Sequence, residues 1–232
     1  MNNQPLPPDG FDRSAAITRS LLGYGVIAGP IYLVVGVILG IVRDGFDFSQ
    51  HALSLLMLGD FGWIQKLNII VVGLMVIAAA TGFARALRGS RIASWAARLV
   101  GGYGACLIAS GIFPPDPMAG FPDESSSEDG TVSGVLHLAF GAIGFLVLAI
   151  AAIMIARWCT GRGETRLALY SRLSALVIVA GFLAGAALAT ETPGVLALWI
   201  AVVAGWAWLA TTSIHLYRTI PHPDAHRRRA AA

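Results

Sequence analysis

The sequence predicts an all-α membrane protein: a polytopic bundle of six transmembrane helices, with both termini cytoplasmic and a short interfacial helix after the first span. Three observations predict this fold class. Of the 232 residues, 56% are hydrophobic and only 12% are charged, whereas a soluble domain carries about 25% charged residues. Six apolar segments are each long enough to cross roughly 30 Å of hydrocarbon. The Lys and Arg residues are distributed very unevenly between alternate loops.

The six segments are continuous apolar runs without a ten-residue alternating repeat, which favours helices over the strands of a membrane barrel. We expect spans at residues 21–42, 63–83, 96–113, 131–156, 167–189 and 194–217. Residues 1–20 are then an N-terminal tail, residues 21–217 the transmembrane domain, and residues 218–232 a basic C-terminal tail.

The charges predict the orientation of these spans. With the N-terminus inside, all of the 16 Lys and Arg residues except Arg43 and Lys66 fall on the cytoplasmic side, and most of the 13 acids fall outside. Because Lys and Arg in short loops stay cytoplasmic, we place both termini inside. The sequence pI of about 9.2 is then explained by arginines that anchor the helix ends against anionic lipid, and a nucleic-acid partner is not expected.

The first external loop contains a candidate catalytic pattern. If residues 48–58 form a short helix, Asp47, His51 and Ser54 fall on one face at i, i+4 and i+7. These are the residue types of a hydrolase triad, but three groups on one helical stripe point the same way and do not converge on a substrate atom. The alternative is a capped interfacial helix, with Asp47 or Ser49 near its N-cap.

Ionisable groups from several loops and helix ends share the external depth. They are His51, Asp60, Asp116, His137 and Glu191. Two histidines with one or two carboxylates are suited to hold zinc or to act as an acid–base pair. The alternative is that they are separate capping and surface groups. No ionisable residue lies in the middle of a span; Asn68, with Gln65 one turn before it, is the nearest polar group.

The segment between the third and fourth spans has two parts. Phe113-Pro-Pro-Asp116-Pro117 ends a helix, because Pro cannot continue one, and should place Asp116 firmly. Residues 123–130 form an acidic, Ser-rich spacer that marks the external side.

Three motifs resemble the bacterial membrane family known as domain of unknown function 998, itself distantly similar to Frag1/DRAM-like proteins. They are a His-x-x-Ser-Leu segment followed by Gly-Trp-x-Gln, a Phe-Pro-x-Asp-Pro sequence, and a His early in the fourth span. Here these residues are His51, Ser54, Gly62, Trp63, Gln65, Phe113, Pro114, Asp116, Pro117 and His137. The resemblance implies six helices in a bacterial plasma membrane, with the motifs on one side and His51, Asp116 and His137 as a shared feature. It implies no established activity.

Three functions remain open at this point. The cluster binds a metal ion, a polar ligand or a lipid head group, through residues among His51, Ser54, Trp63, Gln65, Asn68, Asp116, His137 and Glu191. Alternatively, the protein is a lipid hydrolase or transferase that uses His51, Asp116 and His137. In the third hypothesis it is an accessory subunit without chemistry of its own. Zinc is the candidate cofactor and membrane lipid the expected partner, whereas an ion-coupled transporter is disfavoured because the spans lack an ionisable group at depth.

Overall fold

The computed structural model describes residues 11–122 and 130–225. These residues form six long helices and one short 3₁₀ helix, and each long helix is long and apolar enough to cross a membrane. Their bounds are α1 Arg13–Val42, η1 Leu53–Met57, α2 Gly62–Ala86, α3 Arg91–Ile112, α4 Val132–Thr160, α5 Thr165–Ala187 and α6 Thr192–Thr219. The prediction of a six-helix membrane protein is confirmed. Residues 123–129 of the acidic spacer and the outer parts of both tails lie outside the described residues.

The helices extend beyond the predicted spans mainly at the ends that carry arginine, because capping residues there start the helix before the apolar run. Asp12 caps α1 by accepting a hydrogen bond from the Ala15 amide at 2.9 Å. Ser90 caps α3 in the same way through the Ala93 amide. A side-chain oxygen at this position satisfies one of the backbone donors that a helix N-terminus leaves free.

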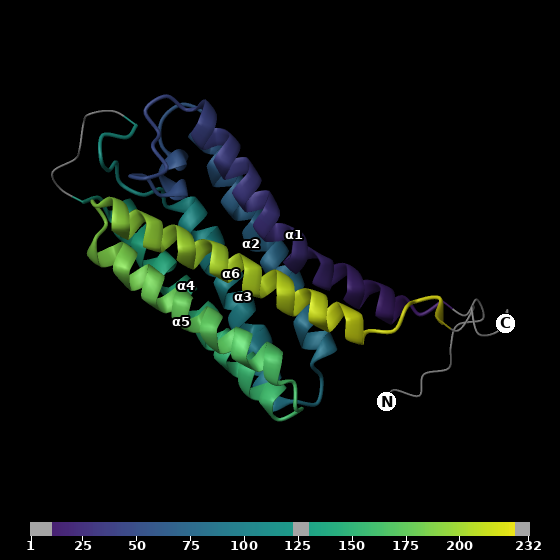
Figure 1. Cartoon of the computed structure of the whole chain (residues 1–232). Helices are drawn as coiled ribbons and strands as arrows, with labels where there is room; N and C mark the ends of the chain where they lie inside the picture. The colour runs from purple at the N-terminus through teal and green to yellow at the C-terminus, as the bar shows by residue number, and fades with distance from the viewer. Residues whose placement is uncertain (1–10, 123–129, 226–232) are drawn as a thin grey trace.

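Each helix packs against its neighbours in the chain, and α1 also packs against α6, so the six helices form a closed ring. Figure 1 shows α1 and α6 converging near the chain termini and diverging toward the opposite end, where η1 lies. Small residues set the close contacts. Gly73 on α2 faces Gly104 on α3, and a Cβ on either would meet the other's carbonyl oxygen within 3 Å. This is how membrane helices approach closely where lipid offers no hydrophobic drive.

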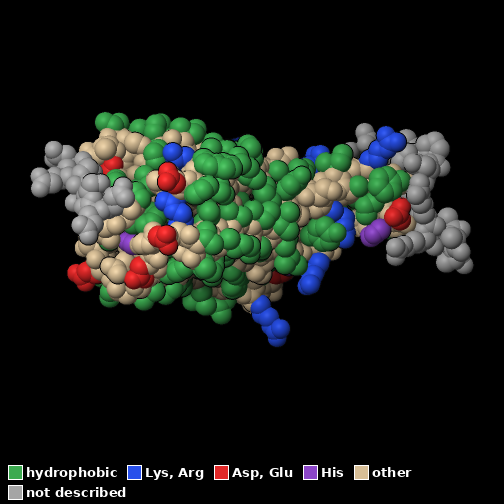
Figure 2. Space-filling model, turned by 90° about the horizontal axis from the view of Figure 1, so that it is seen from above, with side chains coloured by type: hydrophobic (Ala, Val, Ile, Leu, Met, Phe, Trp, Pro, Cys, Tyr) green, Lys and Arg blue, Asp and Glu red, His purple; other side chains and the backbone are tan. Residues whose placement is uncertain are grey.

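The two ends of the bundle differ in charge. We call the end formed by residues 43–61, 113–122, 130–131 and 188–191 the acidic end, and the end that carries both termini the arginine end. Among the described residues, Arg43 is the one Lys or Arg of the acidic end, and Lys66 lies next to it in the first two turns of α2. Figure 2 shows a broad apolar surface between the ends, with most Asp and Glu side chains of this face at one of them. That surface is the part of the protein that faces lipid.

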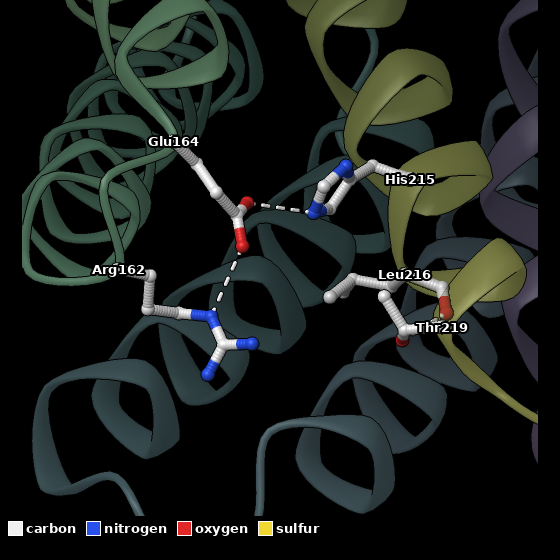
Figure 3. A network of polar contacts seen from close by, with 5 residues as sticks. All are labelled: Arg162, Glu164, His215, Leu216 and Thr219. Carbon is white, nitrogen blue, oxygen red and sulfur yellow. Dashed lines mark hydrogen bonds and ion pairs between the residues drawn. The ribbon is translucent and has the colours of Figure 1, made fainter.

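Polar contacts at the arginine end tie separate helices together. The Oε2 of Glu164, in the connection between α4 and α5, lies 2.9 Å from Nε2 of His215 on α6, and its Oε1 accepts from Arg162 Nε (Figure 3). On the other side of the ring, Arg85 of α2 donates to Thr18 of α1.

The external loop after α1 folds into the bundle. The predicted short helix is present as η1, but it is shorter than residues 48–58 and is buried rather than lying on the surface. Gly36 and Gly40 of α1 make room for it, because they contact the side chains of Leu53 and Phe48. The expected helical stripe of Asp47, His51 and Ser54 does not form, since residues 47–50 make a turn before η1 starts.

Candidate functional site: an interhelical cavity at the acidic end

The acidic half of the ring encloses a cavity of about 620 Å³. Its deep end is aromatic: Tyr32 of α1, Tyr103 of α3 and Trp206 of α6 all line it. The Trp206 ring centroid lies 5.4 Å from that of Tyr32 and 5.9 Å from that of Tyr103. All three residues stand near the middle of their helices, so the cavity reaches about half of the way through the bundle.

The walls are mainly apolar and come from α4, α5 and α6. Phe140, Phe145, Phe182, Leu198 and Val202 are among the lining residues. Glycines widen the space on α4. A Cβ on Gly141 would have no neighbour within 4 Å, although this residue lines the cavity between His137 and Gly144 on one helix face.

The acidic end of the cavity is polar. Gln50 and Ser54 of the first loop, Asp116 after α3, and Ser110 and His137 line it. Three of the predicted site residues, Ser54, Asp116 and His137, are therefore brought to one cavity. The other five predicted ligand-binding residues lie in the part of the chain that the structure describes, and none of them lines the cavity.

His51 is a structural residue of the loops. Its side chain is buried at 3% exposure, its Nδ1 accepts from the Asp47 amide at 2.8 Å, and its Nε2 lies 3.1 Å from the Ala119 carbonyl oxygen. Phe46 and Phe121 pack on the ring. Since a carbonyl only accepts and an amide only donates, the ring is a neutral imidazole with the proton on Nε2. Both nitrogens are occupied by backbone groups.

Asp116 is held at the start of α4. One carboxylate oxygen accepts from the Thr131 amide at 3.0 Å and the other from the Thr131 hydroxyl, which in turn caps α4 through the Gly134 amide. A Cβ on Gly134 would overlap the carboxylate, so glycine is what allows Asp116 to lie against the helix. A negative charge is favourable at this position because the N-terminus of a helix is partially positive.

His137 joins α4 to the end of α3. Its Nδ1 lies 3.0 Å from the Ser110 carbonyl oxygen and 2.9 Å from that of Phe113, so Nδ1 carries a proton and donates. In the neutral ring Nε2 is an acceptor. None of the described residues bonds to Nε2, and His137 lines the cavity, so Nε2 is the ring atom left for a ligand.

The remaining predicted residues lie away from the cavity. Trp63 is 62% exposed on the outer surface of α2, and Asp60 and Glu191 are exposed in loops. Gln65 and Asn68 are buried, and the Asn68 amide donates to the Tyr32 carbonyl at 3.2 Å and to Gln65 at 3.1 Å, which ties α2 to α1.

No group of three or more His, Cys, Asp or Glu side chains in residues 11–122 and 130–225 is arranged to hold a metal ion. The geometry gives the reason, because His51 and Asp116 each bind protein groups in different places. Zinc gains no support from these residues and stays a prediction.

The three aromatic residues at the deep end of the cavity were not predicted from the sequence. Tyr32, Tyr103 and Trp206 lie on three different helices, and their meeting depends on how α1, α3 and α6 face the interior. In the sequence, the glycines Gly141 and Gly144 were the one available signal of space on α4.

The comparisons with known proteins agree with the fold. The family described as "Protein of unknown function (DUF998)" matches residues 26–215. The chain belongs to this family. Comparisons with curated proteins and with solved structures gave no match.

The DUF998 match runs from α1 to near the end of α6 and so includes the whole cavity. The motifs that resembled DUF998 have distinct structural roles here. His51 joins two loops, Asp116 fixes the start of α4, and His137 joins α3 to α4 at the polar end of the cavity.

Proposed function

We propose that this DUF998 protein binds a membrane lipid or a related amphiphile. The ligand's hydrocarbon chain would lie between α4, α5 and α6, and its head group beside Asp116 and His137. The observation that carries the proposal is the cavity of about 620 Å³, which is apolar at depth and polar at the acidic end. Its size is in the range of roughly 300–1,000 Å³ found for small-molecule sites. A few polar groups at one end of an apolar site fix the orientation of such a ligand.

The geometry favours binding over hydrolysis. A general base must reach the substrate proton, and His51 uses both ring nitrogens for backbone groups. His137 and Asp116 do line the cavity, but each is held by protein contacts that fix its position. These two residues are therefore suited to recognise a head group.

We also propose that the acidic end faces the outside of the cell. The arginine end carries Arg85, Arg88, Arg91 and Arg98 in and around the α2–α3 connection, and the positive-inside rule places such a connection in the cytoplasm. The head group would then lie at the outer leaflet.

The cavity is tested by filling it. Gly141→Phe puts a bulky side chain into the cavity, because Gly141 lines it and a Cβ there has no neighbour within 4 Å. Gly102→Phe on α3 is the matched control: a Cβ at Gly102 is equally free, and Gly102 is not in the described lining. Each variant is purified in a mild detergent, and bound lipid is measured by native mass spectrometry.

We expect wild type and Gly102→Phe to retain lipid, and Gly141→Phe to lose most of it while melting within a few degrees of the control. Equal retention in all three proteins, or none in any of them after a mild extraction, would contradict the proposal. The latter result would favour an accessory subunit.

The orientation is tested with single cysteines at Asp60 and Arg88, after the native Cys106 and Cys159 are replaced by alanine. A membrane-impermeant maleimide should label the cysteine at position 60 in intact cells. It should label the cysteine at position 88 only after permeabilisation. The reverse pattern would overturn the placement.

A further inference from the structure

The cavity also indicates which head group it accepts. This inference rests on the proposed function and concerns the same cavity. The hydrocarbon chain of a lipid gains little free energy by moving from the bilayer into an apolar cavity, because both surroundings are equally apolar. Selectivity must then come from the polar end, where hydrogen bonds form in surroundings of low dielectric constant.

The charged groups that face the cavity are of one sign. Asp116 is the only acid in the described lining, and no Lys or Arg belongs to that lining. Arg43, the basic residue of the acidic-end loops, is already engaged: it donates to the carbonyls of Asp60 and Leu58 and lies over the Phe121 ring, 5.4 Å from its centroid. Among the lining residues, a phosphate or carboxylate head group would therefore meet no cationic partner and one like charge.

The ionisable groups at this end offer free acceptors, whereas the hydroxyls of Ser54 and Ser110, which also line it, can donate or accept. His137 Nε2 accepts in the neutral ring, since Nδ1 donates to the two carbonyls. The Asp116 carboxylate has about four acceptor sites, of which the Thr131 amide and hydroxyl use two. Gly134, which touches Asp116, and His137 are three residues apart on α4, so both acceptors lie on one helix face.

From this arrangement we infer that the cavity selects an amphiphile whose head group donates hydrogen bonds, an ammonium or hydroxyl group, and rejects acceptor-only anionic head groups. An ammonium satisfies both acceptors and offsets the charge of Asp116. A hydroxyl satisfies one of them. A carboxylate satisfies neither acceptor and is repelled by Asp116; the Ser54 and Ser110 hydroxyls can donate to it but carry no charge to offset that repulsion. Leaving the polar groups of a site unpaired is what makes it reject the wrong ligand.

Four probes with the same twelve-carbon chain test the inference at pH 8: dodecylamine, monododecylglycerol, dodecanoate and dodecylphosphocholine. The last is a zwitterion, with a quaternary ammonium and a phosphate, and has no hydrogen-bond donor. Adducts are counted by native mass spectrometry, and the count for Gly141→Phe is subtracted as non-specific binding. We expect the amine and the glycerol ether to exceed the other two by about tenfold, the effect of one charge-assisted hydrogen bond.

Two variants separate recognition from folding. In His137→Asn the shorter amide still reaches toward the Ser110 and Phe113 carbonyls as Nδ1 does, but the Nε2 acceptor is gone. It should lose most of its preference for the glycerol ether over dodecanoate while its melting temperature stays close to that of wild type. Asp116→Asn should reduce the preference for the amine over the glycerol ether.

The outcomes distinguish the two proposals. Binding of dodecanoate or dodecylphosphocholine as strongly as the amine, with all adducts lost in Gly141→Phe, would overturn the head-group inference and leave the lipid site standing. Absence of any Gly141-dependent adduct with all four probes would overturn both.

Discussion

The Nε2 of His51 lies 3.1 Å from the carbonyl oxygen of Ala119, so one imidazole connects the loop after α1 to the loop after α3. Ala119 is held with φ at 52°, a left-handed conformation that a residue with a side chain adopts rarely. The contact explains how two loops separated by the whole of α2 and α3 form a single cover at the acidic end.

The contact predicts that His51 supports stability and not metal binding. His51→Phe keeps an aromatic ring against Phe46 and Phe121 but leaves the Asp47 amide and the Ala119 carbonyl without their partner. We expect a loss of about 1–3 kcal/mol, the usual cost of buried polar groups left unpaired. Thermal unfolding in detergent measures it, with the exposed His222→Phe as control. An unchanged melting temperature together with loss of a bound metal would contradict this assignment.

Asp47 should make the same loop sensitive to acid. Hydrogen bonds from the Ser49 side chain and then its amide lower the pKa of Asp47 from 3.8 to about 2. Because the folded pKa is the lower one, the stabilisation is complete above 3.8 and is lost as the pH falls through about 2. Exchange of the Ser49 amide should therefore be slower in wild type than in Asp47→Asn at neutral pH, and the ratio should approach one near pH 2.

Asp44→Asn is the control for that experiment, since Asp44 is exposed on the same loop and has no side-chain hydrogen bond among the described residues. Its exchange ratio should stay close to one throughout. A ratio for Asp47→Asn that does not change with pH would show that the charge of Asp47 does not stabilise the turn.

Gly134 should be intolerant of any side chain. An added Cβ would overlap the Asp116 carboxylate and push it away from Thr131, so Gly134→Ala should cost about 1–3 kcal/mol, as overpacking does. Gly130→Ala is the matched control, because its Cβ would lie at an ordinary 3.6 Å from the same carboxylate. Equal melting temperatures for the two variants would contradict the geometry.

At the arginine end, Glu164 should couple to His215 rather than to Arg162. The Glu164 and His215 side chains are 27% and 32% exposed, whereas that of Arg162 is 55% exposed. The more exposed Arg162 side chain therefore loses more conformational entropy when the ion pair holds it in one position. A double-mutant cycle with Glu164→Gln and His215→Phe should give a coupling energy of about 1 kcal/mol, after allowance for screening by solvent. The cycle with Arg162→Ala should give about half of that or less. A larger coupling to Arg162 would reverse the assignment.

The sequence was sufficient for the fold class because the membrane imposes strong rules. Without water, each backbone group must bond within its own segment, so six long apolar runs become six helices. The gathering of Arg85, Arg88, Arg91 and Arg98 in and around the α2–α3 connection predicts, by the same kind of rule, that this connection is cytoplasmic. The bounds differed where capping residues such as Asp12 started a helix before its apolar run.

The site was harder to predict because depth along a helix does not fix direction around it. His51, Asp116 and His137 were expected at one depth; His51 and Asp116 lie at the acidic end, and His137 lies next to it in the second turn of α4. Yet each turns to a different protein partner: His51 to the loop at Ala119, Asp116 to Thr131, and His137 to the end of α3.

By itself, the sequence determined that this protein has six membrane-spanning helices, which residues lie at each end, and which polar types are available for a site. Only the tertiary structure decided that His51 joins two loops while His137 and Asp116 line a cavity. It also decided that Tyr32, Tyr103 and Trp206 meet at the deep end of that cavity. The physical reason is that hydrophobicity and charge act along the membrane normal and can be read from one chain segment. The facing of side chains within the ring depends instead on the packing of all six helices together.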